Sequence, residues 1–254
     1  MSGLWPFLRK EALEILRTWR IWVLPGVLLF MGLSSPILAS VMPEVMKSVA
    51  AQQPGVQVQL PPPTFTDAYA QWVKNLSQLV LWVVIISGGG IVSAEHRSGT
   101  AILALTKPLS RAAFVLGRTA SSAALLGLSA LAGAAVCFAA TALLFPGAPL
   151  APLSQATLAW LAAAGMMTCV MALASALVEA QAGAAGIGFG VLAALYLSAL
   201  WRPLARFGPA ALLSAPGELI AGKTPELGWP LVTAAGVAVT CLAAAIAWYS
   251  RKEL

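Results

Sequence analysis

The sequence has few charged residues and few of the side chains on which enzymes depend. Only 9% of its 254 residues are charged, against about a quarter in an ordinary soluble domain, so the chain is not a typical soluble enzyme. His96 is the only histidine, and the HExxH motif of metalloproteases is missing. The three cysteines, Cys137, Cys169 and Cys241, lie in apolar runs without CxxC spacing, which indicates neither a zinc site nor a disulfide framework.

Long apolar runs take the place of the missing charge. Hydrophobic residues make up 59% of the chain, and a membrane-spanning helix needs about 20 predominantly apolar residues in succession. The sequence therefore predicts an all-α membrane protein, with a single transmembrane domain over residues 1–254 and six transmembrane helices. The expected spans cover about residues 21–41, 76–94, 113–145, 154–178, 182–201 and 229–249.

The basic residues indicate how these spans are oriented. Cytoplasmic loops of membrane proteins carry an excess of Lys and Arg. With both termini inside, ten basic residues lie on the inner side and five on the outer side. The third run is too long for one simple span, so we expect its first turns, with Arg118, at the inner interface. The sequence thus predicts a multi-pass protein of the cell membrane with cytoplasmic N- and C-termini.

The N-terminal residues and the longer loops have patterns of their own. Residues 1–20 place apolar and basic side chains on opposite faces at helical spacing, which predicts an amphipathic helix in the inner interface. Such a helix is either a simple anchor or a docking surface for a cytoplasmic partner. The expected outer loop at 42–73 is rich in proline and is interpreted mainly as a spacer. The apolar part of the loop at 202–228 is too short to cross, which favours a re-entrant or interfacial element.

Two glycine motifs have to be weighed against simpler explanations. Residues 217–224 read GELIAGKT and match the phosphate-loop pattern, but the prolines that follow leave no room for the helix that such a loop requires. We interpret this match as chance and predict no cofactor. Gly183, Gly186 and Gly190 form a small face in the fifth span, and the GxxxG spacing permits close contact between membrane helices. Packing within the subunit is slightly favoured over a dimer seam.

The predicted spans contain no charge near their middle. Ionisable residues inside membranes normally mark ion or proton pathways, so this pattern argues against a proton-coupled transporter or a pump. The basic residues lie at the ends of apolar runs and form no stripe with exposed aromatics, which argues against nucleic-acid binding. The chain also offers no catalytic constellation and no set of metal ligands.

The most informative polar segment follows the second span. It reads SAEHRSGT at 93–100 and LALTKPLSR at 103–111. Gly99 permits a sharp turn, and Pro108 ends any short helix before it. From these properties alone, a solvated turn with positive charges on the inner side is favoured over a functional element.

This segment resembles a loop of type-2 ATP-binding-cassette (ABC) transporter permeases. The resemblance rests on the glutamate at 95, a basic residue, Gly-Thr at 99–100, and Lys-Pro at 107–108 after an apolar stretch. The chain length, the six spans, the Arg-Lys-Glu of the N-terminal helix and the basic tail are also similar to those of family members. The resemblance covers essentially the whole chain.

The resemblance implies a division of labour between subunits. Two permease subunits, identical or related, form the membrane pathway, and separate cytoplasmic ATPase subunits hydrolyse ATP, so the chain itself is not an enzyme. The first inner loop is then the coupling element that docks on the ATPase, and the N-terminal helix lies alongside it. The implied coupling residues are Glu95, His96, Arg97, Gly99, Thr100, Lys107 and Pro108, and the implied docking residues of the N-terminal helix are Arg9, Lys10 and Glu11.

A pathway without fixed charges suits a hydrophobic or amphipathic substrate, and the direction expected for the family is export. A second hypothesis stays open at this point. A non-transporting membrane module that anchors or assembles other proteins would use the same amphipathic N-terminus and the same basic loops. An ATPase gene beside the gene for this chain would favour transport over this alternative.

Overall fold

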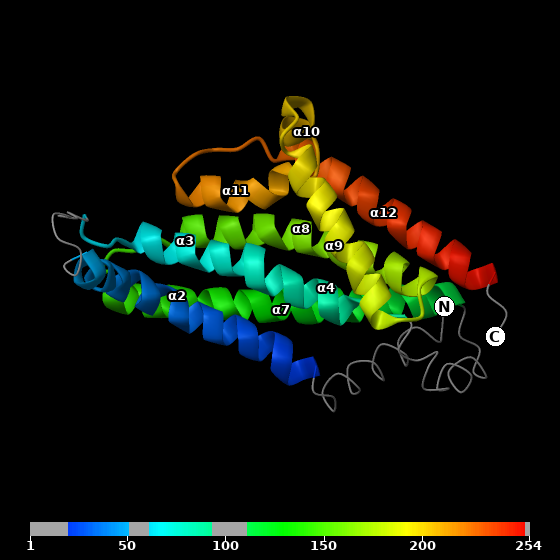
Figure 1. Ribbon diagram of the computed structural model, residues 1–254, viewed down its shortest axis with the longest axis horizontal. Helices are drawn as coiled ribbons and strands as arrows, with labels where there is room; N and C mark the ends of the chain where they lie inside the picture. Colours follow the sequence, from blue (N-terminus) through cyan, green and yellow to red (C-terminus); the bar gives the residue numbers. More distant parts are fainter. Residues whose placement is uncertain (1–19, 51–60, 93–110, 252–254) are drawn as a thin grey trace.

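The structure is a computed structural model that describes residues 20–50, 61–92 and 111–251. All regular elements in these ranges are helices, which confirms the predicted all-α class (Figure 1). Five helices are long and apolar enough to cross a membrane. They are α2 (Arg20–Ala50), α7 (Arg111–Leu144), α8 (Leu150–Leu177), α9 (Gln181–Ser198) and α12 (Gly228–Arg251).

The second predicted span consists of three consecutive helical elements. α3 (Phe65–Asn75), the π-helical segment η1 (Leu76–Val80) and α4 (Leu81–Gly88) follow one another without a break. The run begins earlier than predicted because the backbone N–H of Thr64 donates a 2.8 Å hydrogen bond to Asp67 Oδ2, a capping box that stabilises a helix start. Since α2 also continues to Ala50, the connection between these helices is shorter than the outer loop predicted at 42–73.

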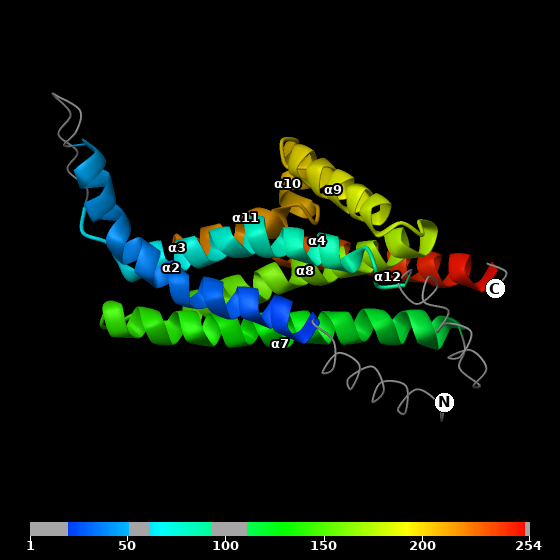
Figure 2. The ribbon, with the colours of Figure 1, turned by 60° about the horizontal axis from the view of Figure 1, so that its bottom comes forward.

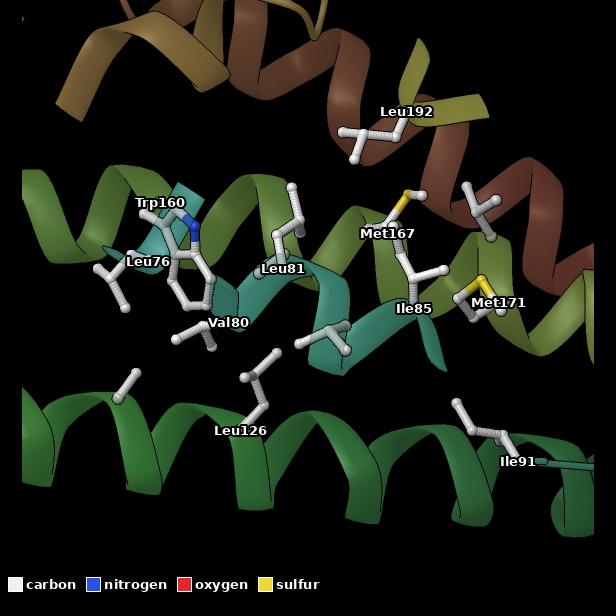
Figure 3. Close-up of a cluster of buried hydrophobic side chains, with 14 of the residues drawn as sticks. Leu76, Val80, Leu81, Ile85, Ile91, Leu126, Trp160, Met167, Met171 and Leu192 are labelled. Carbon is white, nitrogen blue, oxygen red and sulfur yellow. The ribbon is translucent and has the colours of Figure 1, made fainter. Parts of the chain in front are cut away.

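The central helix is α8, which contacts α4, α7, α9, α11 and α12. Its many alanines present little side chain, so neighbouring helices can approach its backbone closely. The second span lies between α8 and α7, and its apolar side chains fill the space between them (Figure 3). The labelled members of this cluster are Leu76, Val80, Leu81, Ile85, Ile91, Leu126, Trp160, Met167, Met171 and Leu192.

Successive spans alternate in direction, so their ends gather at two ends of the bundle. The ends of α4, α8 and α12 and the starts of α7 and α9 lie together (Figures 1 and 2); we call this the Arg111 end. At the opposite end, the end of α7 lies near the starts of α3 and α8. There Tyr69 Oη donates a 3.0 Å hydrogen bond to the Pro149 carbonyl oxygen, which ties α3 to the start of α8.

Two short helices occupy the stretch between the fifth and sixth predicted spans. They are α10 (Arg202–Phe207) and α11 (Ala211–Ile220), and both are too short to cross a bilayer. α11 packs against α8 and buries Leu212, Ala215 and Pro216. Whether this short element is re-entrant or interfacial, as expected from the sequence, stays a prediction.

The phosphate-loop match lies at the end of α11. Gly222 has a left-handed φ of +75°, and the Lys223 N–H donates a 2.9 Å hydrogen bond to the Glu218 carbonyl oxygen. These features end a helix at its carbonyl terminus. A phosphate loop instead binds its ligand at the amide terminus of the helix that follows it, so the geometry at 217–224 differs from that of a phosphate loop.

Candidate functional site at the Arg111 end of the bundle

Most of the residues predicted to act in coupling lie outside the described ranges. This applies to residues 1–19 of the interfacial helix predicted at 1–20 and to Glu95, His96, Arg97, Gly99, Thr100, Lys107, Pro108, Arg9, Lys10 and Glu11. The predicted coupling segment lies between Val92 and Arg111, which are the described residues on either side of it. Both of these residues lie at the Arg111 end of the bundle, and their contacts determine what the segment is connected to.

The Val92 side of the segment is attached to α8 and α9. At the end of α4, glycines at 88–90 make a turn that brings the chain against α8. A Cβ at Gly88 would lie 2.8 Å from Met171 Cβ, and a Cβ at Gly89 would lie 2.6 Å from the Gln181 carbonyl oxygen. Neither approach leaves room for a side chain, so glycine is required at both positions.

Hydrogen bonds complete this attachment. The Val92 N–H donates a 3.0 Å bond to Ser175 Oγ on α8, and Gln181 Nε2 donates a 3.0 Å bond to the Ile86 carbonyl oxygen of α4. Val92 is buried, and a buried backbone N–H is costly to leave without an acceptor. The end of the second span is therefore held to the central helix by a directional contact as well as by packing.

The Arg111 side of the segment is attached to α12. Arg111 Nη1 donates hydrogen bonds of 2.9 Å and 3.4 Å to the carbonyl oxygens of Ser250 and Tyr249. A cation is favourable at this place because the last carbonyl groups of a helix lack partners within the helix and carry partial negative charge. Phe114 stacks on Tyr249 with ring centroids 5.6 Å apart. Polar and aromatic contacts therefore join the start of α7 to the end of α12.

Arg118 lies two turns further along α7. Its position at the inner interface stays a prediction. The structure shows that its side chain is turned into the protein, with only 5% of its surface exposed. Its Cζ atom lies 5.9 Å from the centroid of the Phe114 ring, a distance at which a cation is attracted by an aromatic face. Arg118 thus belongs to the same group of contacts as Arg111, Phe114 and Tyr249.

We slightly favoured packing of Gly183, Gly186 and Gly190 within the subunit, but the structure orients this face of the fifth span differently. Gly186 and Gly190 lie on the exposed side of α9, with no atom of another element within 4 Å of an added Cβ. Gly183 approaches Val178 Cγ1, and the contact with the core is made by Gly188, where an added Cβ would lie 2.8 Å from Ile85 Cγ2. Packing within the subunit therefore depends on Gly188 and not on the GxxxG pair, and contact of that pair with another helix stays a prediction.

The described contacts at this end attach helices to one another. Among the described residues, no three His, Cys, Asp or Glu side chains are grouped so that they could hold a metal ion. The arrangement joins one chain segment to α8, α9 and α12 at the same time. Such an arrangement can transmit displacement between helices.

Sequence reasoning missed several of these contacts. The run of three glycines at 88–90 was a usable signal, because consecutive glycines after an apolar helix indicate close backbone approach. Ser175 gave no signal, since a single serine in an alanine-rich run is common. Its role depends on the crossing of α4 with α8, which the sequence does not specify.

Comparison with known proteins agrees with the resemblance inferred from the sequence. Residues 5–229 match the family described as "ABC-2 family transporter protein". The chain is also similar to "Uncharacterized transmembrane protein YxlG" of Bacillus subtilis (strain 168), with 24% identity over 256 residues that cover 99% of this chain and 98% of the relative. Because the family match extends over most of the chain, the protein belongs to the ABC-2 transporter family and is a membrane permease component of an ABC transporter.

Proposed function

We propose that the chain is the permease subunit of an ATP-driven exporter of a hydrophobic or amphipathic substrate. A separate cytoplasmic ATPase subunit hydrolyses the ATP, and a second permease subunit, identical or related, completes the pathway. The chain lies in the cell membrane with both termini in the cytoplasm. The observation that carries the proposal is family membership together with the attachment of both ends of the predicted coupling segment to three membrane helices.

The contacts suggest how movement of the ATPase reaches the membrane. A displacement of the segment at 93–110 acts on α8 through the Val92–Ser175 bond and the Gly88–Met171 contact. It acts on α12 through the contacts of Arg111 with the last carbonyl groups of that helix. Because packed helices tend to shift as rigid bodies between discrete arrangements, closure of the ATPases would move α8 and α12 together.

The ATPase partner is tested by isolation from native membranes. The tagged full chain, extracted in mild detergent, should retain a cytoplasmic protein that has a phosphate loop and hydrolyses ATP. Isolation of the chain with other proteins but reproducibly without any ATPase would contradict the proposal and favour a membrane assembly module.

The coupling segment is tested in the isolated complex. Glu95→Ala and Gly99→Pro should uncouple ATP hydrolysis from transport. Glu95→Ala removes a charge from the predicted contact with the ATPase, and Gly99→Pro removes the sharp turn that glycine permits there. Lys223→Ala is the matched control, since Lys223 lies beyond the end of α11 in the segment that resembles a phosphate loop. If both coupling variants assembled and transported like the unmodified complex, the assignment of the segment would be wrong.

A further inference from the structure

A cavity of about 350 Å³ lies between the second half of α2 and α3. It is at the end of the bundle opposite to the Arg111 end, where α3 begins. Ligand-binding pockets in proteins have volumes of roughly 300–1,000 Å³, so the space is large enough for the head group of a lipid. The two helices that form its walls differ in chemistry, and this difference indicates what would bind.

The cavity lies where α2 bends away from the rest of the bundle (Figure 2). α2 contains Pro36 and Pro43 in its second half, and a proline inside a helix removes a backbone hydrogen bond and bends the helix. Just before these prolines the two helices are held together, because Asn75 Nδ2 donates a 3.0 Å hydrogen bond to Ser35 Oγ. The cavity is therefore a wedge that is closed towards the middle of the bundle and widens towards its end.

The wall formed by α2 is apolar. Leu38, Met42 and Met46 line it, and their spacing of four residues places them on one face of the helix. This wall suits the glycerol end of an acyl chain. It does not select one lipid over another, because the tails of all lipids are as apolar as these side chains. Any selectivity has to come from the opposite wall.

The wall formed by α3 carries two opposite charges. Asp67, Gln71 and Lys74 line the cavity, and their spacing of four and three residues places them on one face of α3. Both charged side chains are exposed. Asp67 Oδ2 accepts hydrogen bonds from the N–H and the hydroxyl group of Thr64, and the second carboxylate oxygen, Oδ1, can accept one from a ligand. The cavity therefore presents a carboxylate and an ammonium group along the same strip.

The order of these charges matches that of a zwitterionic phospholipid. Asp67 lies in the first turn of α3 and Lys74 in the last, so Asp67 is nearer to the end of the bundle. Seven residues separate them by about 10.5 Å along the axis, and the Lys74 side chain leans back towards the start of the helix. In a phospholipid the phosphate is next to the acyl chains and the ammonium group lies beyond it, nearer to water. The phosphate would thus meet Lys74 and the ammonium group would meet Asp67, in whichever leaflet this end of the bundle lies.

We infer that this cavity binds a zwitterionic phospholipid of the bilayer, with its phosphate at Lys74 and its ammonium group at Asp67. Phosphatidylethanolamine fits best, because its primary ammonium group donates charge-assisted hydrogen bonds to a carboxylate. The bound lipid fills the wedge between α2 and α3 and holds the two helices in position. The inference goes beyond the proposed function, since binding requires neither an ATPase nor transport and can be measured on this chain alone.

The binding test is native mass spectrometry of the full chain in detergent. Phosphatidylethanolamine is compared with phosphatidylglycerol of the same acyl chains, which keeps the phosphate and replaces the ammonium group by neutral hydroxyl groups. We expect the first molecule of phosphatidylethanolamine to bind at least about threefold more tightly, as one additional charge-assisted contact at an exposed site allows. Equal affinity for the two lipids, or a preference for phosphatidylglycerol, would overturn the inference.

The carboxylate is tested by Asp67→Asn. The amide oxygen of asparagine can still accept the hydrogen bond from the Thr64 N–H that starts the helix, whereas the charge is lost. The variant should lose the preference for phosphatidylethanolamine without weaker binding of phosphatidylglycerol. Glu44→Gln is the matched control, because Glu44 is exposed at the same end of α2 and does not line the cavity. A preference that persists in Asp67→Asn would overturn the inference.

The cation is tested by Lys74→Gln. Both lipids carry a phosphate, so this variant should weaken the binding of both, and Lys74→Arg should retain it. Lys47→Gln is the matched control, since Lys47 is exposed on α2 and does not line the cavity. Unchanged binding of both lipids by Lys74→Gln would show that the phosphate lies elsewhere and would overturn the inference.

A variant that leaves both charges in place covers the case in which a charge substitution disturbs the fold. Ala70 lines the cavity from α3 between Asp67 and Lys74, and it is exposed. Ala70→Phe therefore places a ring in the cavity without overpacking the core, and it should remove the preference for phosphatidylethanolamine. A folded Ala70→Phe protein that keeps this preference would show that the lipid binds elsewhere and would overturn the inference.

Discussion

The backbone N–H of Val92 donates a 3.0 Å hydrogen bond to Ser175 Oγ, although the two residues are 83 positions apart in the chain. This bond joins the end of the second span to the central helix α8. It lies at the start of the segment predicted to contact the ATPase, so it is the first contact through which a pull on that segment would reach the bundle.

Loss of this hydrogen bond should destabilise the protein. Ser175→Ala removes the acceptor and leaves a buried N–H, which costs about 1–3 kcal/mol. We expect a clearly lower thermal midpoint for the purified chain in detergent. Ser214→Ala is the control, since Ser214 is exposed and bonds only within α11. Equal midpoints for the two variants would show that the Val92–Ser175 bond contributes nothing to stability.

The glycines of α9 should respond differently to the same substitution. Gly188→Ala forces a methyl group towards Ile85 and Met171, and overpacking of this kind typically costs about 1–3 kcal/mol. Gly186→Ala meets no atom of another element, and replacing glycine by alanine in a helix is favourable by itself. Thermal unfolding of the two variants should therefore shift in opposite directions or differ widely, and a larger loss for Gly186→Ala would contradict this packing.

Arg111 should hold the last turn of α12 in place. Arg111→Gln removes a cation from a helix carbonyl end, which costs about 0.3–1 kcal/mol at exposed sites and up to about 2 kcal/mol when partly buried. We expect faster amide hydrogen exchange at 247–251, with α8 unaffected. Arg202→Gln, on the exposed helix α10, should leave exchange in α12 unchanged. Unaltered exchange in Arg111→Gln would mean that its contacts with Tyr249 and Ser250 are not maintained in the membrane.

A buried polar contact joins α2 to the second span, and it should contribute to stability. Asn75 Nδ2 donates a 3.0 Å hydrogen bond to Ser35 Oγ, directly before the π-helical segment. A double-mutant cycle with Asn75→Ala and Ser35→Ala should give a coupling energy of about 0.5–1.5 kcal/mol. The same cycle with Ser40→Ala should give a value near zero, because Ser40 bonds only to Ile37. Comparable coupling in both cycles would refute a specific contact.

The sequence predicted the class of fold and the family better than it predicted the packing. Apolar runs of about 20 residues identify membrane helices because the bilayer excludes unpaired backbone groups, and this property needs no tertiary information. The start of the second span was placed too late because Asp67 and Lys74 interrupt the apolar run. The Thr64–Asp67 capping box, which extends the helix outward, was present in the sequence and was not used.

The inward face of each helix was the harder part to predict. A membrane helix is apolar on all sides, so hydrophobic periodicity does not separate the surface towards lipid from the surface towards the protein. This is why the close contact of α9 was assigned to the GxxxG pair and not to Gly188. Arg118 was likewise taken as an interfacial charge, and only the arrangement of α2, α4 and α7 reveals that it lines a cavity.

The most direct test of the account is site-directed photo-cross-linking in native membranes. A photoreactive amino acid in place of Arg97 in the full chain should form a covalent product with a cytoplasmic ATPase, and the same amino acid in place of Lys223 should not. The yield of this cross-linked product should change when ATP is added, because the ATPase opens and closes. A chain that transports normally but gives no ATPase product at 97, or an equal product at 223, would contradict the proposed coupling.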